Sequence, residues 1–262
     1  MEIRNRVWLG LGVVVAASAA FYAGTSSQTD LGHDMSAMDE EGGEGGEGAS
    51  TEDAISNDAV YLAQLSFIRG HLYVGVSLYR EGDLEASATH MKHPGDELYA
   101  ALLPAIESRD GTGFGDQLQN LADAVIERRS AADVEAAYSA LLVAIGAAEG
   151  AVKDLSARTL GEVIVDLVRT AAAEYDIAVD DNGMLVEPHE YQDSLGFVHT
   201  AKEKFDLLAT MSDNEAALMA IDVQLQMLLP IWPSLQAPEK LSTEPSVIYG
   251  AASRIEIATT QL

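Results

Sequence analysis

The 262-residue sequence contains no cysteine. This absence excludes disulfides, thiolate metal sites, thiol nucleophiles, covalent haem attachment and a lipidated N-terminal cysteine. Basic residues are also scarce, because 15 lysines and arginines stand against 42 acids and leave a formal net charge of −27. A surface this acidic repels phosphate backbones and anionic lipid headgroups, so we expect no nucleic-acid partner and favour cations. Any metal must bind to His, Met, Asp, Glu or Tyr.

Sequence signatures of common enzymes are missing as well. No G-x-S-x-G, H-E-x-x-H or Walker A pattern occurs, and these are patterns of serine nucleophiles, zinc hydrolases and phosphate-binding loops. The letters G-x-G-x-x-G occur at 43–48, but this stretch is acidic and follows no predicted strand. Another glycine cluster, at 111–115, also follows no predicted strand and lacks the spacing that holds a pyrophosphate. We therefore predict that the protein is not an enzyme.

The N-terminal residues 1–24 have the composition of a membrane-targeting segment. A short basic stretch precedes an uncharged apolar run of eighteen residues, 7–24, whose length lies between a long signal-peptide core and a short spanning helix. The flanking charges place the N-terminus inside and the bulk of the chain outside. Small residues at 17–20 would suit a signal peptidase, whereas Phe21 and Tyr22 suit an interfacial belt and favour an uncleaved anchor. We expect a periplasmic protein anchored to the inner membrane, or released if the segment is cleaved.

Residues 25–58 are expected to form a disordered, glycine-rich acidic linker. They contain ten acids, no Lys or Arg and almost nothing apolar, so they cannot bury a core. His33, Met35 and Met38 lie in this stretch and offer ligands that copper accepts in either oxidation state. One imidazole and two thioethers do not close a ligand set, so the pattern favours a solvated linker, and metal binding by these three residues stays open.

Residues 59–262 are predicted to form one periplasmic all-helical domain, a bundle of about seven to eight helices. They are rich in Ala, Leu, Glu and Asp, and glycine, proline and Asn-Gly signals interrupt apolar stripes of helical spacing. A short extended stretch is expected at 184–188. The expected helices include 83–90, 116–127, 131–152, 157–176, 190–211, 214–229 and 246–259.

A helical hairpin at the start of this domain brings histidines together. Apolar residues step by three and four along 61–79, and Glu81-Gly82-Asp83 then provides a turn and an N-cap. His71 lies about eleven residues before Gly82, whereas His90 and His93 lie about eight and eleven after it. At a rise of about 1.5 Å per residue, both arms place their imidazoles roughly 12 to 17 Å from the turn. The three rings are therefore expected to be neighbours.

This hairpin is our first predicted metal site, with His71, His90, His93 and Glu97 as ligands. Glu97 is the least certain ligand, because Pro94 is expected to start a new helix and to interrupt the register. Burying several imidazoles without partners would cost a few kcal/mol each, which a metal or a carboxylate would offset. A competing interpretation makes His71 a hydrogen-bonded helix residue and the stretch around His90 an exposed connector.

A family resemblance lies further along the chain. Residues 173–179 read A-E-Y-D-I-A-V, Asn182-Gly183 follows, and residues 187–198 read E-P-H-E-Y-Q-D-S-L-G-F-V. This pattern is similar to the extracytoplasmic helical domain that precedes the membrane part of bacterial oxidase-dependent, high-affinity iron permeases. The resemblance implies a periplasmic helical module that works beside iron or another transition metal. The chain lacks the permease's polytopic membrane region, so the resemblance implies binding or delivery rather than transport by itself.

The resemblance covers Glu174, Tyr175, Glu190, Tyr191 and Asp193. Glu190 and Asp193 are three apart on one helical face, and Glu174 lies on the preceding helix, folded back across the turn. Converging carboxylates suit iron or manganese, so these three acids form our second, weaker predicted metal site. Alternatively, the acids complement the dipole of a helix N-terminus and the tyrosines belong to the core.

These patterns lead to one functional hypothesis and two alternatives. The chain is expected to bind a transition metal ion, iron or copper, for uptake or homeostasis without turnover. One alternative is a helical adaptor that docks on an inner-membrane transporter or complex through the hairpin surface. The other is a helical haem-binding protein that uses His and Met91. His189 and His199, ten residues apart on one predicted helix, are not expected to cooperate.

Overall fold

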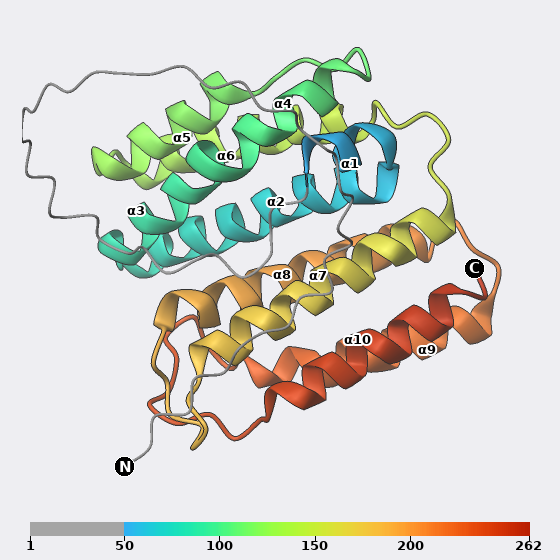
Figure 1. The fold of residues 1–262 in the computed structure, drawn as a ribbon. Coiled ribbons are helices and arrows are strands. Elements are labelled where there is room, and N and C mark those ends of the chain that lie inside the picture. Colours follow the sequence, from blue (N-terminus) through green and yellow to red (C-terminus); the bar gives the residue numbers. More distant parts are fainter. Residues whose placement is uncertain (1–49) are drawn as a thin grey trace, which may run out of the picture. The chain divides into compact units, whose positions relative to one another are not determined.

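The computed structural model describes residues 50–262, apart from the side chains of His93, Asp96 and Glu97. In this part of the chain, ten α-helices and two short helices of other types account for the secondary structure, together with isolated bridges at 179–185 and 184–240 (Figure 1). The all-helical prediction is confirmed. The predicted membrane segment and the stretch that contains His33, Met35 and Met38 lie outside the described residues.

The elements follow one another closely along the described chain, and the predicted helices listed above end within about three residues of the observed ones. Their bounds are α1 (Thr51–Ser56), α2 (Asp58–Glu81), α3 (Leu84–His93), the π-helix η1 (Pro94–Tyr99), α4 (Ala100–Glu107), α5 (Gly115–Ile126), α6 (Ala131–Glu149), α7 (Ala157–Ala178), α8 (Pro188–Leu208), α9 (Glu215–Leu228), the 3-10 helix η2 (Leu229–Ile231) and α10 (Pro245–Thr259).

Helix α1 lies where the acidic linker was expected, so the described helices outnumber the predicted seven to eight. Ser50 caps it by accepting a hydrogen bond from the Asp53 amide, and Thr51 donates one to the Ala101 carbonyl on α4. Ala54 is buried. A short acidic segment thus becomes ordered because one apolar side chain and a cap attach it to the bundle.

The predicted hairpin is formed by α2 and α3. Gly82 ends α2 with a φ of 87°, a left-handed conformation that glycine adopts without strain, and Asp83 caps α3 at the Ala86 amide. Pro94, expected to begin a new helix after a break, instead lies in an unbroken helical run from α3 through η1 to α4. Because proline lacks an N–H and crowds the preceding turn, the helix widens there to the π register.

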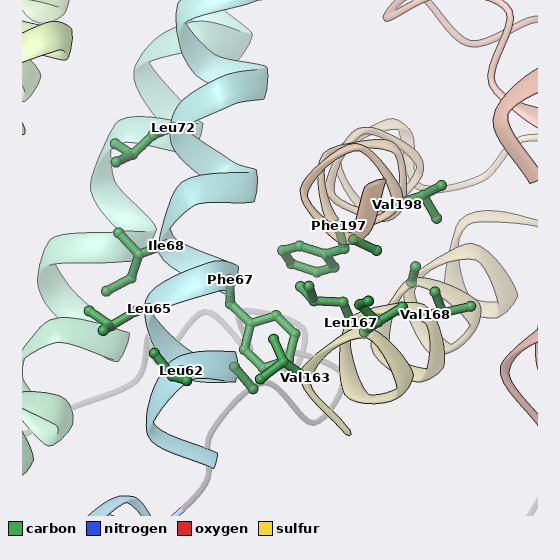
Figure 2. Packing of buried hydrophobic residues seen from close by; sticks show 14 of the residues in the cluster. Leu62, Leu65, Phe67, Ile68, Leu72, Val163, Leu167, Val168, Phe197 and Val198 are labelled. Atoms are coloured by element: carbon green, nitrogen blue, oxygen red, sulfur yellow. The ribbon is translucent and has the colours of Figure 1, made fainter. Parts of the chain in front are cut away.

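Helices α7 to α10 pack as antiparallel neighbours, with α7 against α8 and α10, and α10 against α9 (Figure 1). Helix α2 lies against α3, α7 and α8. Figure 2 shows the core at this junction, where Phe67 of α2 meets Phe197 of α8 edge to face with ring centroids 5.2 Å apart, beside Val163 and Leu167 of α7. This packing fixes α2 against α8, which is the contact that builds the candidate site.

Among the described helices, α6 alone is long and apolar enough to cross a membrane by length and composition. Its polar contacts attach it to the other helices. The Tyr61 hydroxyl donates to the Ala148 carbonyl at 3.0 Å, and Glu149 binds both Arg69 of α2 and Lys204 of α8. These contacts are those of a helix held within the bundle.

Candidate metal centre

His71 and His90 meet where α2 and α3 approach each other most closely. A Cβ atom on Gly75 would lie 2.1 Å from the end of the Met91 side chain and 3.2 Å from the His90 Cβ, so a larger residue would require Met91 to move. Both imidazoles are fully buried, with ring centroids 6.3 Å apart. The hairpin therefore brings these two histidines together as predicted from their distance to the turn.

Asp193 of α8 completes the cluster. A Cβ on Gly196 would lie 2.6 Å from the Gly70 carbonyl oxygen, so the α2 and α8 backbones touch one helical turn from Asp193 and one residue from His71. Asp193 Oδ1 lies 2.6 Å from His71 Nδ1 and 3.0 Å from His90 Nδ1. Donor atoms of the three buried residues lie within 4.8 Å of one another.

A chain of hydrogen bonds fixes the protonation of His90. The Gln192 side-chain amide donates to the Leu235 carbonyl at 3.2 Å, and a carbonyl can only accept, so Gln192 Oε1 faces His90 Nε2 at 2.9 Å. His90 Nε2 must therefore carry a proton, and Nδ1 is the ring nitrogen that faces Asp193 Oδ1.

The carboxylate at the centre is ionised. Burial acts to raise the pKa of Asp193, but the facing His71 and His90 rings and their hydrogen bonds outweigh it and hold that pKa well below its usual value. At 3.0 Å from this anion, His90 Nδ1 is placed to hold a cation against Asp193 Oδ1, and either a proton or a metal ion can fill that role.

The donor set fits a first-row transition metal. Two imidazole nitrogens and a carboxylate oxygen suit iron, zinc and similar ions. With metal–ligand bonds of about 2.1 Å, two donors at a right angle lie about 3.0 Å apart, which is the spacing of His90 Nδ1 and Asp193 Oδ1. The shorter His71 contact is a hydrogen-bond distance, so metal binding would replace that bond.

His189, at the second residue of α8, is a neighbour that the sequence reasoning missed. Its Nε2 lies 3.1 Å from Asp193 Oδ2, and its ring stacks on His90 with centroids 4.0 Å apart. The i, i+4 spacing of His189 and Asp193 on a predicted helix was the signal that could have found it. His199 stacks instead on Tyr73, at 3.6 Å.

The remaining predicted ligands are distributed differently from the two sites expected. The side chains of His93 and Glu97 lie outside the described residues. Glu174 is buried on α7 and Glu190 is half-buried on α8, but neither joins a group of three donors among the described side chains. Asp193, expected in the second site, lies with the hairpin histidines, so the expected separation into two sites is corrected. The reason is the α2–α8 contact, which sequence spacing does not reveal.

The two tyrosines of the resemblance are buried. Tyr175 donates to the Thr243 carbonyl and Tyr191 to the Ser234 carbonyl. Burial raises the pKa of Tyr191 to about 12, with Tyr175 contributing. Both are therefore neutral core residues whose hydroxyls attach α7 and α8 to the segment between α9 and α10.

Part of the chain matches a known protein family. Residues 152–262 match the iron permease-associated 4-helix bundle domain, and the resemblance expected from the sequence is confirmed for this stretch. No curated protein and no solved structure matches the chain. The matched stretch contains α7 to α10, including His189, Gln192 and Asp193, whereas His71 and His90 come from helices that precede it.

Proposed function

Because residues 152–262 match the iron permease-associated 4-helix bundle domain, we propose that the chain binds an iron ion at His71, His90 and Asp193. The domain points to an iron-related function linked to transport. In our proposal the ion is cargo, held without catalytic turnover and passed to or from a membrane transporter. The apolar segment 7–24 would place this module in the periplasm, on an inner-membrane anchor.

The observation that carries the proposal is the contact between His90 Nδ1 and Asp193 Oδ1. Gln192 Oε1 accepts the proton of His90 Nε2, so Nδ1 is the ring nitrogen that faces the ionised oxygen, at 3.0 Å inside the bundle. A metal cation between these two atoms would bind both of them in place of a proton. Each residue then has a role: Asp193 supplies the negative charge, and the two histidines supply neutral nitrogen donors.

Iron is favoured over copper for two reasons. Imidazole and carboxylate donors, as in the cluster of His71, His90 and Asp193, suit Fe(II). The matched domain is named for association with iron permeases. The net charge of −27 would raise the local concentration of any divalent cation near the protein.

The two alternative functions are supported less well. A haem would need space between its axial ligands, but Asp193 fills the space between His71 and His90. An adaptor that docks through the hairpin surface would not use His71 and His90, because both rings are buried. If the chain is instead an adaptor that docks through another surface, substitution of Asp193 should leave metal binding unchanged.

Asp193→Asn tests the proposal directly. This variant keeps the shape of the side chain and removes the charge. We expect the anaerobically purified full chain in detergent to bind about one Fe(II) with a Kd below about 10 μM, and Asp193→Asn to bind at least about 100-fold more weakly. Competition with a chromophoric chelator measures both affinities, and circular dichroism checks the fold.

The matched control is His199→Ala, which removes a half-exposed imidazole from the same helix and leaves the cluster intact. It should bind Fe(II) as the unsubstituted chain does. The proposal is wrong if the unsubstituted chain binds no Fe(II), or if Asp193→Asn binds it equally well.

A further inference from the structure

Helix α9 is apolar on two opposite faces. Its inner face buries Ile221 and Leu225 in the bundle. Its outer face carries Met219, Val223 and Met227, four residues apart, which are 68%, 47% and 62% exposed; we call these three the outer stripe. A surface helix normally carries polar residues on its outer face, whereas a helix that is apolar all round is buried. The outer face of α9 therefore has the composition of a covered surface.

The neighbouring helix α10 extends this apolar surface. Helices α9 and α10 form the outer layer of the bundle, and α7 and α8 lie between them and α2 (Figure 1). Val247 and Ile257 of α10 are 47% and 68% exposed. A groove of about 490 Å³ lies between α9 and α10 and is lined by Gln224, Met227, Ser246, Val247, Gly250 and Arg254. A Cβ on Gly250 would meet only the Arg254 side chain, at 3.3 Å, so the floor of the groove is open to a second surface.

Two charged side chains of this surface lack a counterpart. Arg254 lines the groove, and Asp222 lies beside the outer stripe on α9. Neither makes an ion pair with another described residue, and Asp222 accepts only a 3.5 Å hydrogen bond from Gln226 of its own helix. A guanidinium and a carboxylate that border an apolar surface call for opposite charges on whatever covers it.

The two charges flank the outer stripe on opposite sides. At about 100° per residue, the stripe spans about 80° of α9. Gln224, which lines the groove, lies about 60° beyond one edge and so marks the side of α10, whereas Asp222 lies about 60° beyond the other edge. Because α9 and α10 run antiparallel, and 224–227 shares the groove with 246–254, Asp222 lies near the level of Arg254 along the bundle. The surface is therefore negative on one flank and positive on the other.

We propose that this surface is the interface between two copies of the chain. A two-fold axis parallel to α9, between the two outer stripes, places the Asp222 flank of each copy on the Arg254 flank of the other. The stripes then bury each other, and two ion pairs form at their edges. A two-fold axis across α9 would place like flank on like flank, so the charges select the parallel arrangement.

The acidity of the whole chain does not prevent this contact. The net charge of −27 opposes the approach of two copies, but at physiological salt such repulsion is screened beyond about 8 Å. The interface is also independent of the proposed iron site, which is built from α2, α3 and α8. The two proposals can therefore fail separately.

Charge reversal tests the pairing. Sedimentation equilibrium of the full chain in density-matched detergent measures the Kd of the dimer, and circular dichroism checks the fold. We expect Asp222→Arg and Arg254→Asp each to raise this Kd by about tenfold or more, and the double variant to restore it to within about threefold. The single variants change the net charge in opposite directions, so a loss in both and its rescue assign the effect to the ion pair.

The absence of cysteine permits a second test, of position. In the parallel arrangement Val223, at the centre of the outer stripe, faces Val223 of the other copy. Val223→Cys should therefore form a disulfide-linked dimer under mild oxidation. Val143→Cys is the matched control, because Val143 is 74% exposed on α6, outside this surface, and it should link far more slowly. A dimer held only by segment 7–24 would show no such preference.

Three results would overturn the inference. The first is a full chain that stays monomeric at about 100 μM. The second is a double charge variant that associates as weakly as the single ones. The third is Val223→Cys linking no faster than Val143→Cys, which would assign the surface to a different partner. None of these results bears on Fe(II) binding by the unsubstituted chain, so the proposed function is tested separately.

Discussion

Gln192 is predicted to control metal affinity without touching the metal. Its amide accepts from His90 Nε2 and donates to the Leu235 carbonyl, so it keeps a proton on Nε2 and leaves Nδ1 as the nitrogen that a metal would bind. Gln192→Met has a similar shape and neither accepts nor donates. In that variant the proton of neutral His90 can move to Nδ1, where it bonds to Asp193 and blocks the metal.

The size of the effect follows from this loss. Removing a hydrogen bond that orients a metal ligand lowers affinity by about 10- to 100-fold, which corresponds to about 1.4 to 2.8 kcal/mol. Gln192→Glu should behave differently, because its carboxylate still accepts from His90 Nε2 and keeps Nδ1 available. We expect the Glu variant to retain Fe(II) affinity, although it faces the Leu235 carbonyl with an acceptor and is less stable.

Chelator competition under anaerobic conditions measures these affinities. Ser194→Ala is the control, because it removes another buried hydrogen bond of α8, to the Ala171 carbonyl at 2.6 Å, and touches neither histidine. It should lower the free energy of unfolding by about 1 kcal/mol and leave Kd unchanged. If Gln192→Met keeps its affinity within about threefold, the tautomer reasoning is wrong.

Two further predictions concern the fold that holds the site. Glu149→Gln leaves Arg69 and Lys204 without their shared anion and should lower the free energy of unfolding by about 2 kcal/mol at pH 7. Burial acts to raise the pKa of Glu149, but Lys204 and Arg69 outweigh this effect, so the pKa is lowered. In urea denaturation, the difference in free energy of unfolding between the unsubstituted chain and the variant should be at its full size above pH 4.5. It should vanish as the pH falls through the lower pKa of the folded state. Gly196→Ala places a Cβ 2.6 Å from a backbone oxygen of α2 and should cost about 1 to 3 kcal/mol and weaken Fe(II) binding. Gly95→Ala is the control, because a Cβ there meets nothing within 4 Å, and it should change neither the free energy of unfolding nor Fe(II) binding. Equal stability of the two alanine variants would contradict the close contact between α2 and α8.

Local sequence patterns predicted the helices and the hairpin well. Apolar spacing and caps located most helices, and Gly82 with Asp83 located the turn that brings His71 beside His90. These features depend on residues close together in the chain, so spacing alone is sufficient. Helix α1 was missed because its stability comes from tertiary contacts, such as the Thr51 bond to Ala101, rather than from its own apolar stripe.

The composition of the cluster could not be predicted in the same way. Asp193 is 122 residues from His71, and the two meet because glycines let α2 and α8 touch. Nothing in a single sequence states which helices become neighbours, so Asp193 was placed with nearby acids instead. His189 was missed because its spacing was compared with that of His199 and not with that of Asp193, its i, i+4 partner.

The site is therefore a joint product of two parts of the chain. The matched domain contributes Asp193, Gln192 and His189, and the preceding hairpin contributes His71 and His90. The carboxylate alone is a weak ligand, whereas two added imidazoles make a set that selects a transition metal. In the proposed function, the helices before residue 152 would contribute the two imidazole ligands, and the matched bundle would contribute the carboxylate.

The most direct test is a crystal of the protein loaded anaerobically with Fe(II), measured on both sides of the iron absorption edge. The account predicts one anomalous peak bounded by Asp193 and the Nδ1 atoms of His71 and His90. A loaded crystal with no iron at this position, and with the His71–Asp193 hydrogen bond intact, would contradict it.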